Sequence, residues 1–376
     1  MRDLRIMESI RKDKYIKSRY SSLYLICIIA ISITACSEPY NFSPDINVDG
    51  IVVDGLITDQ PGVYQVRLHK ASSYGNASNI AVQKANVSIT DDAGNVYLLT
   101  EYKDIPGLYQ TDLYEFTGIP GHSYTLHIST FEGDAYQSTP QLLLPNQRID
   151  SVYGEKSFEN ILDVDADGNY ISYKSEGIIT YLDLKNRFDG NQNYRLMNSI
   201  YLQYMYQNPA PFSPPMYGWT KYIPPIPGDG MDLINNLEDY SSAEFKKLKF
   251  SFIPFSSAIY NLDPIASIGK TALLINQFRM NDETNEYYKD IDKQLRAEGR
   301  LFDPISTQLI GNITCLNDPN KQAFGFFEAS SKISYVYTDE SYIWVEKPIL
   351  KFRAIDLDNI PSSGASAYTP PSFWIY

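Results

Sequence analysis

Cysteine and histidine are scarce in this sequence, with three of each among 376 residues. Cys27 and Cys36 lie near the N-terminus, so Cys315 has no partner within the body of the chain and no internal disulfide framework is expected. His122 and His127 are an odd number of residues apart, which places them on opposite faces of a regular strand. The sequence therefore predicts neither a zinc site nor a histidine-based triad.

Catalytic motifs and excess positive charge are also missing. The sequence contains no GxSxG elbow, no glycine-rich phosphate loop and no HExxH helix, so we expect a protein that is not an enzyme. Its many carboxylates leave a glycosidase-like pair open, because only the spacing in three dimensions defines such a pair. The net charge of −13 opposes contact with polyanions, so no nucleic-acid partner is expected.

No apolar run is long enough to cross a membrane. The longest one, Leu23–Ile33, has eleven residues, whereas a spanning helix needs about 17–25. A basic arm precedes the run, as in a secretory signal, and leaves Met1 or Met7 as the start. The last residue of the run, Ile33, begins the segment "ITAC", which resembles a bacterial lipobox, so residues 1–35 are predicted to be a lipoprotein signal peptide.

The lipobox resemblance implies that Cys36 becomes the first residue and carries acyl chains such as palmitate. Two or more chains anchor a protein stably, since each buried methylene contributes about 0.8 kcal/mol. Ser37 replaces the aspartate that often retains lipoproteins at the inner membrane, so we expect an outer-membrane location. Whether the protein faces the periplasm or the cell surface stays open.

Short β-type segments dominate the first part of the mature chain. A tether at 36–47 leads into seven of them, at 50–58, 63–70, 85–91, 95–101, 107–113, 123–130 and 134–138, separated by turn formers such as "DDAG" and "IPG". Tyr124, Leu126 and Ile128 alternate and should share a buried face. The fold predicted for 48–145 is a β-sandwich of immunoglobulin-like or transthyretin-like type.

Residues 146–376 are predicted to form a second β-rich domain with one prominent helix. Strand-like segments lie at 170–186, 193–206, 247–257, 271–280 and 324–338. The helix is expected near 282–298, because acidic residues open it, basic residues close it and Gly299 ends it. Tyr287, Ile291 and Leu295 would form the apolar stripe that packs on a sheet.

A proline-rich segment at 206–230 reads as a long loop, because proline cannot donate ladder hydrogen bonds. Its aromatic residues Phe212, Tyr217, Trp219 and Tyr222 are predicted to contact a partner if they are exposed. In that case replacing Trp219 with alanine would leave the stability nearly unchanged. A large loss of stability would instead show that the segment folds back onto its own domain.

An acidic segment raises the question of calcium. Asp163, Asp165, Asp167 and Gly168 have the spacing of positions 1, 3, 5 and 6 of a calcium loop, but Lys174 stands where a bidentate glutamate belongs. The flanking residues also indicate strands and not helices. The pattern favours a solvated acidic hairpin without a cofactor and leaves a looser calcium turn as the alternative.

Several motifs in order resemble a known family. The lipobox is followed by "VVDGLITDQPGVYQVRL", "GIPGHSYTLHI", "RIDSVYGE", "GRLFDPISTQLIGNITC" and "FGFFEASS", and this series resembles the Bacteroidota lipoproteins of domain-of-unknown-function family 4249. The resemblance implies a cell-envelope lipoprotein, often encoded beside a TonB-dependent outer-membrane receptor. It implies no activity and no catalytic residue.

These observations predict a binding or accessory subunit of a TonB-dependent transporter, held at the outer membrane by the lipid on Cys36. Two alternatives remain open. One is a structural or adhesive surface lipoprotein, and the other is a hydrolase that acts on carbohydrate or peptide.

Overall fold

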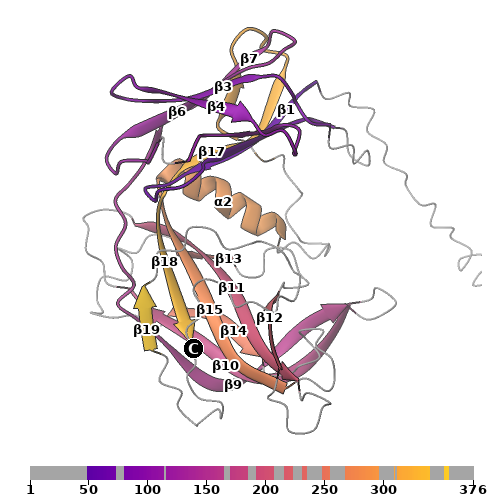
Figure 1. The fold of residues 1–376 in the computed structure, drawn as a ribbon, viewed down its shortest axis with the longest axis vertical. Coiled ribbons are helices and arrows are strands. Elements are labelled where there is room, and N and C mark those ends of the chain that lie inside the picture. The colour runs from indigo at the N-terminus through magenta and orange to yellow at the C-terminus, as the bar shows by residue number, and fades with distance from the viewer. Residues whose placement is uncertain are drawn as a thin grey trace, which may run out of the picture. The chain divides into compact units, whose positions relative to one another are not determined.

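The computed structural model describes residues 49–72, 80–113, 116–164, 170–184, 192–206, 216–222, 231–234, 248–254, 267–295, 309, 311–338 and 351–354. Contacts between Cα atoms place all of them in a single compact unit. Strands β1 to β19 and the helix α2 make up the regular structure of this part of the chain, as Figure 1 shows. The predicted mainly β class, with one prominent helix in the second half, is confirmed.

The first sheet has ten strands in the order β16-β7-β6-β3-β4-β5-β2-β1-β17, with β8 beside β6. Because the terminal strands β16 and β17 contact each other, the sheet is nearly closed. Two separate layers, as in the predicted sandwich, are not confirmed. The strands are β1 (Gly50–Ile57), β2 (Gln65–Lys70), β3 (Asn86–Asp91), β4 (Val96–Glu101), β5 (Leu108–Gln110), β6 (Ser123–Ser129), β7 (Ala135–Ser138), β8 (Gln141–Leu142), β16 (Ile313–Cys315) and β17 (Gln322–Ala329).

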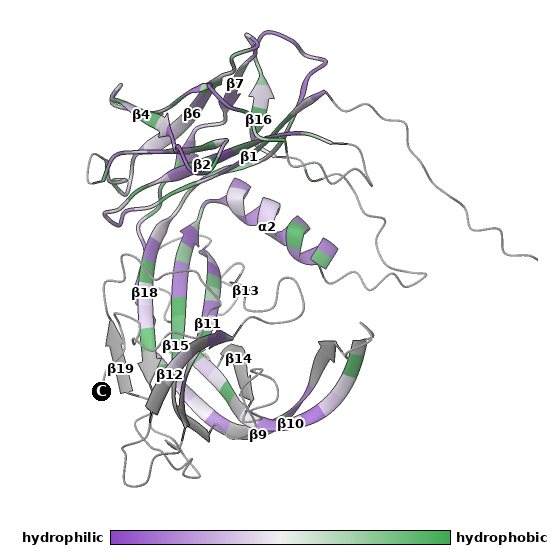
Figure 2. Ribbon diagram, turned by 45° about the vertical axis from the view of Figure 1, so that its right-hand side comes forward, coloured by the Kyte–Doolittle hydropathy of each residue, from purple (hydrophilic) through white to green (hydrophobic). Residues whose placement is uncertain are grey.

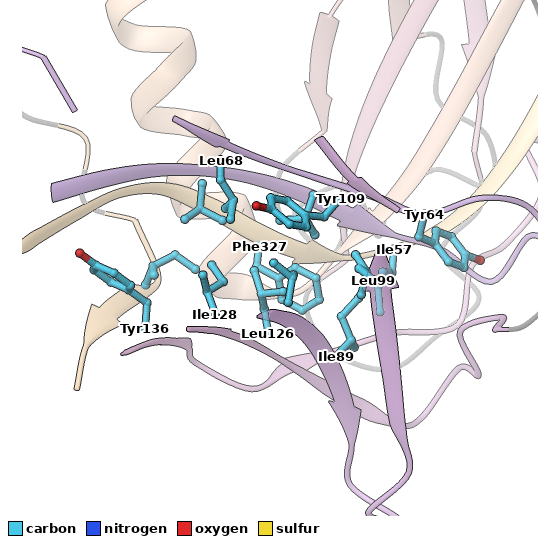
Figure 3. Packing of buried hydrophobic residues seen from close by; sticks show 14 of the residues in the cluster. Ile57, Tyr64, Leu68, Ile89, Leu99, Tyr109, Leu126, Ile128, Tyr136 and Phe327 are labelled. Atoms are coloured by element: carbon cyan, nitrogen blue, oxygen red, sulfur yellow. The ribbon is translucent and has the colours of Figure 1, made fainter. Parts of the chain in front are cut away.

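Alternating apolar residues fill the interior of this sheet. The three predicted core residues of β6, Tyr124, Leu126 and Ile128, are at most 1% exposed, which confirms that they share the buried face. Figure 3 shows Leu126 across from Leu68, with Phe327 of β17 between them. Period-two alternation places every second side chain in this core and leaves the others on the outer face.

Strand β17 comes from the far end of the sequence and pairs in parallel with β1 along its whole length. The first sheet therefore draws on residues from both sides of the predicted domain boundary at 145/146. Gly325 makes the close pairing feasible: its φ is +83°, and a Cβ there would lie 1.9 Å from the carbonyl oxygen of Val53. Such a long-range pairing is set by tertiary contacts that sequence neighbours do not encode.

Two further sheets contain the remaining strands. The three-stranded sheet has the order β14-β10-β9, and the six-stranded sheet has the order β12-β11-β15-β18-β19 with β13 beside β11. Their bounds are β9 (Ser151–Val164), β10 (Tyr170–Asp183), β11 (Asn193–Tyr206), β12 (Met216–Tyr222), β13 (Met231–Ile234), β14 (Leu248–Pro254), β15 (Ser267–Met280), β18 (Ser331–Thr338) and β19 (Lys351–Ala354). Strand β9 is absent from the sequence-based expectation.

The single strand-like segment predicted at 324–338 is two strands in different sheets. β17 ends at Ala329 in the first sheet, and β18 starts at Ser331 in the six-stranded sheet. Between them, the backbone N–H of Ser330 donates to the carbonyl of Ile57 at 3.1 Å. The composition is β-type throughout 324–338, so it gave no sign that the chain passes from one sheet to another at Ser330.

The prediction of one loop at 206–230 is wrong for residues 216–222. These residues form β12, which pairs antiparallel with β11 and places Trp219 opposite Gln203. Trp219 is 6% exposed, so its side chain is not an exposed anchor. The strand has no proline, so its backbone can pair even though prolines flank it on both sides.

The predicted helix is confirmed as α2 (Asp282–Leu295). Tyr287 of the predicted stripe stacks on Phe326 of β17, with ring centres 4.5 Å apart, but the fully buried side chains of the helix lie elsewhere. Asn281 caps it, since its side-chain oxygen accepts from the N–H of Thr284 at 2.8 Å. Thr284 and Asn285 are buried, whereas Leu295 is 38% exposed. Figure 2 shows hydrophilic residues at the start of α2, and hydrophobic residues among hydrophilic ones only in its second half. The first turns thus bury polar groups, which hydropathy assigns to the surface.

Candidate ligand-binding cleft

The outer face of the first sheet carries a row of chemically different side chains. Asp54 of β1 is paired opposite Arg67 of β2, and Arg67 is paired opposite Leu108 of β5. Their neighbours Val53, Val66 and Tyr109 point into the core, so alternation places this row on the opposite face. An acid, a base and an apolar side chain therefore stand side by side across three strands.

A cleft of about 460 Å³ lies over this row. Its lining residues are Asp54, Leu56, Thr58, Gln60, Pro61, Gly62, Val63, Tyr64, Gln65, Arg67, Leu108, Phe278 and Lys332. One wall is the β1–β2 hairpin with its loop, and the other is formed by Phe278 of β15 and Lys332 of β18. The lining combines charged and polar groups with apolar side chains, so it can contact both kinds of group on a ligand.

The loop that forms the rim of the cleft is held by hydrogen bonds. The Tyr64 hydroxyl donates to the carbonyls of Thr58, at 2.5 Å, and of Gln60. The Gln60 side chain in turn donates to the carbonyl of Lys332 at 2.9 Å, and the Lys332 N–H donates to Oδ1 of Asp59 at 2.8 Å. These bonds fix the hairpin loop to β18, so the two walls of the cleft are joined at its rim.

Asp59 is partly removed from water in this arrangement. Burial raises the pKa of its carboxyl group above the ordinary value, and the hydrogen bond from the Lys332 backbone opposes that shift. Because burial has the larger effect, the folded protein favours the protonated form of Asp59 more than the unfolded chain does.

A buried ion pair lies beside the cleft. Glu328 of β17 is paired next to Leu56, a lining residue, and its carboxylate contacts the guanidinium of Arg195 on β11. Nη2 of Arg195 donates to both carboxylate oxygens, at 2.9 and 2.7 Å, and the Tyr288 hydroxyl of α2 donates to Oε2 at 2.8 Å. The Arg195 and Glu328 side chains are only 5% and 2% exposed.

Aromatic rings complete the surroundings of Arg195. Its guanidinium carbon lies 4.3 Å from the ring centre of Phe278, which lines the cleft, and 4.2 Å from that of Tyr288. Burial acts to lower the pKa of Arg195, but the charge and hydrogen bond of Glu328, together with Tyr288 and Asp54, outweigh it and the pKa is raised. Burial, reinforced by Glu328, also raises the pKa of Tyr288 well above its ordinary value. Both groups therefore keep their protons at physiological pH.

The start of α2 is tied to the first sheet by a polar network. Gln141 of β8 donates to Glu283 at 2.6 Å and accepts from Asn281 at 2.9 Å, and the Thr139 hydroxyl donates to Glu283 at 2.9 Å. The negative charge of Glu283 in the first turn also suits the helix dipole. The helix that presents Tyr288 to the buried ion pair is thereby fixed at its N-terminal end.

Comparison with family models gives one match, to the family described as Domain of unknown function (DUF4249), over residues 37–335. The match spans most of the 376 residues. The chain belongs to the DUF4249 family. The matched region contains every lining residue of the cleft and the Arg195–Glu328 pair. The comparison with curated proteins found no match.

The predicted site residues of this DUF4249 protein lie elsewhere or outside the described residues. Cys36, Asp165, Asp167 and Phe212 are outside them. Of Asp163, Tyr217 and Tyr222 only the backbone is described, in β9 and β12. Val164 pairs with Tyr170, so β9 and β10 form the expected hairpin around the acidic segment. The calcium and partner-contact roles of these residues stay predictions.

Grouped metal ligands and membrane-spanning helices are both missing from the described residues. Among them, no three or more histidine, cysteine, aspartate or glutamate side chains are grouped as metal ligands would be. The same part of the chain has no helix with the length and apolar character needed to span a bilayer.

Sequence reasoning missed the cleft of this DUF4249 protein, although signals for parts of it exist. Glu328 interrupts the apolar segment "FGFFEA", and a charged residue in such a segment usually has a buried partner. Asp54 similarly interrupts "GIVVDGLI". Nothing in the sequence, however, indicated that Phe278 and Lys332 would lie opposite them.

Proposed function

We propose that this protein is a lipid-anchored binding or accessory protein of the cell envelope, which associates with a TonB-dependent outer-membrane transporter. The observation that carries the proposal is the cleft over the outer face of β1, β2 and β5. It combines charged and apolar surface, and hydrogen bonds join its two walls at the rim. A cleft that is already formed loses little conformational entropy on binding, which favours affinity.

The proposed membrane attachment is supported by the lipobox that ends at Cys36. The family match begins at residue 37, directly after this cysteine, as expected if the body shared by the family starts after the lipid-bearing residue. Acyl chains on Cys36 would hold the cleft-bearing unit near the membrane, where a transporter would receive what it binds.

Metabolic labelling with an alkyne analogue of palmitate, followed by membrane fractionation, tests the attachment. We expect the wild-type chain to be labelled and to sediment with membranes. Cys36→Ala should be unlabelled and should remain unprocessed or soluble. Cys315→Ala is the matched control: Cys315 is a buried free thiol, so this variant should be labelled like the wild type. Equal labelling of Cys36→Ala and the wild type would refute the anchor.

Association with a transporter is tested separately by purifying the detergent-solubilised wild-type protein under mild conditions. We expect a TonB-dependent outer-membrane barrel to co-purify, identified by mass spectrometry, and to be lost on competition with the untagged protein. Membrane attachment without any such barrel would favour the structural or adhesive alternative.

A further inference from the structure

Two opposite charges in the cleft are available to a ligand. Asp54 and Arg67 are both exposed and stand directly opposite each other on adjacent strands. Within the residues that the structure describes, neither side chain takes part in an ion pair or a side-chain hydrogen bond. Directly opposed residues on antiparallel strands have Cβ atoms about 5 Å apart. An acceptor for an ammonium group and a donor for a carboxylate thus lie within the length of one or two amino-acid residues.

Apolar surface adjoins this pair. Leu56, two positions after Asp54 on the same face of β1, is half-buried and lines the cleft. Val63 of the hairpin loop also lines the cleft and is 39% exposed. Leu108 and Phe278, in contrast, are covered almost completely by protein, at 3% and 5% exposed. Leu56 and Val63 therefore offer apolar surface beside the two charges.

The charge of the cleft differs in sign from that of the whole protein. The chain carries a net charge of −13, yet the three charged residues of the lining are one acid, Asp54, and two bases, Arg67 and Lys332. A carboxylate that the acidic surface repels elsewhere would be attracted here, most strongly to the guanidinium, which can bind it through two parallel hydrogen bonds.

We propose that the cleft binds a small zwitterionic ligand with an apolar side chain, that is, an amino acid or a short peptide with free ends. The ammonium group binds Asp54, the carboxylate binds Arg67, and the apolar side chain packs against Leu56 and Val63. This ligand class rests on the proposed binding function and specifies it. A volume of about 460 Å³ accommodates a ligand of this size.

Isothermal titration of the purified full-length protein in detergent tests the proposal, with L-leucine and L-leucyl-L-leucine as probes. We expect at least one of them to bind, and its N-acetylated and C-amidated derivatives to bind about tenfold more weakly or worse, because each loses one charge-assisted hydrogen bond. Which of the two parent probes binds more tightly distinguishes an amino-acid site from a peptide site.

Variants then connect each end of the ligand to its residue. Arg67→Gln should weaken binding of the parent probe about tenfold but leave binding of the C-amidated probe nearly unchanged, since that probe no longer uses the guanidinium. Asp54→Asn should behave in the same way toward the N-acetylated probe. Lys103→Gln and Asp104→Asn make comparable changes at exposed positions that do not line the cleft, and they should bind like the wild type.

Three outcomes would overturn the ligand class. The first is that neither parent probe binds at millimolar concentration, although the melting temperature shows that the protein is folded. The second is equal binding of the parent and the blocked probes, and the third is an effect of the control variants as large as that of the cleft variants. Recovery of a transporter barrel by the same preparation would show that the proposed function holds even where the ligand class fails.

Discussion

Replacing Glu328 with glutamine should strongly destabilise the protein. The change keeps the size of the side chain but removes the charge that compensates Arg195, which is buried with only 5% of its side chain exposed. With the charge centres about 4 Å apart and an effective dielectric constant of about 20, the lost attraction is about 4 kcal/mol. This agrees with the roughly 3–5 kcal/mol that breaking one side of a buried ion pair costs.

Equilibrium unfolding in urea, followed by circular dichroism, measures this effect. We expect the free energy of unfolding of Glu328→Gln to fall by about 3–5 kcal/mol. Glu132→Gln is the matched control, because Glu132 makes an ion pair of similar length with Lys70 on the surface, at 2.6 Å. Such an exposed pair contributes about 0–1 kcal/mol, so this variant should unfold almost like the wild type.

Two further variants separate the charge from the packing. Tyr288→Phe removes only the hydrogen bond to Glu328 and should cost about 1.5–3 kcal/mol, since the acceptor is charged. The double variant Arg195→Met with Glu328→Leu removes both charges and should be much more stable than Glu328→Gln alone. A loss below about 1 kcal/mol in Glu328→Gln would refute the view that Arg195 depends on this carboxylate.

Three other substitutions probe separate parts of the described chain. Trp219→Ala should lower the free energy of unfolding by about 3–5 kcal/mol, because Trp219 is 6% exposed, and a change near zero in urea unfolding would contradict its burial. Gly325→Ala should prevent normal pairing of β17 with β1, because its Cβ would lie 1.9 Å from the Val53 carbonyl oxygen; native-like circular dichroism and melting temperature would contradict this. Burial raises the pKa of Asp59 above 3.8, so the wild type loses stability as the pH rises through the interval between that value and its folded pKa. Asp59→Asn cannot ionise and its side-chain oxygen can still accept from the Lys332 N–H, so it should not show this loss. The free energy of unfolding of the variant minus that of the wild type should therefore increase from pH about 3 to about 7. A difference that does not change with pH would contradict the raised pKa of Asp59.

Local patterns in the sequence were sufficient for individual elements. β-type composition between turn residues predicted β1 to β7 of the first sheet. Alternation predicted the buried side chains Tyr124, Leu126 and Ile128, because one face of each strand must avoid water. Capping residues and charge order predicted α2 with nearly correct ends, because these effects act within a single turn. Turn residues predicted the β3–β4 hairpin, where the Asn95 N–H donates to the Asp91 carboxylate at 2.8 Å.

Hydropathy misjudged the elements that are covered on more than one side. The predicted stripe of α2, Tyr287, Ile291 and Leu295, ends in an exposed residue, whereas the helix fully buries Thr284 and Asn285. The Thr284 hydroxyl donates to Gln141. Prolines on both sides of Trp219 indicated a loop, yet β11 supplies a partner strand for the proline-free residues between them. A propensity describes one residue in its local context, and a neighbouring strand can override it.

The sequence by itself therefore determined the β-rich class, the position of most strands, the helix and the lipobox that predicts acylation of Cys36, all of which depend on neighbouring residues. Only the tertiary structure decided that β17 completes the first sheet beside β1, that Glu328 meets Arg195, and that Phe278 and Lys332 close a cleft over Asp54 and Arg67. The physical reason is that these contacts join residues more than a hundred positions apart. Bringing such distant residues together costs conformational entropy for closing a long loop. That cost is offset only when the core and the sheet pairings form around them, so the packing of the whole chain decides which distant residues meet.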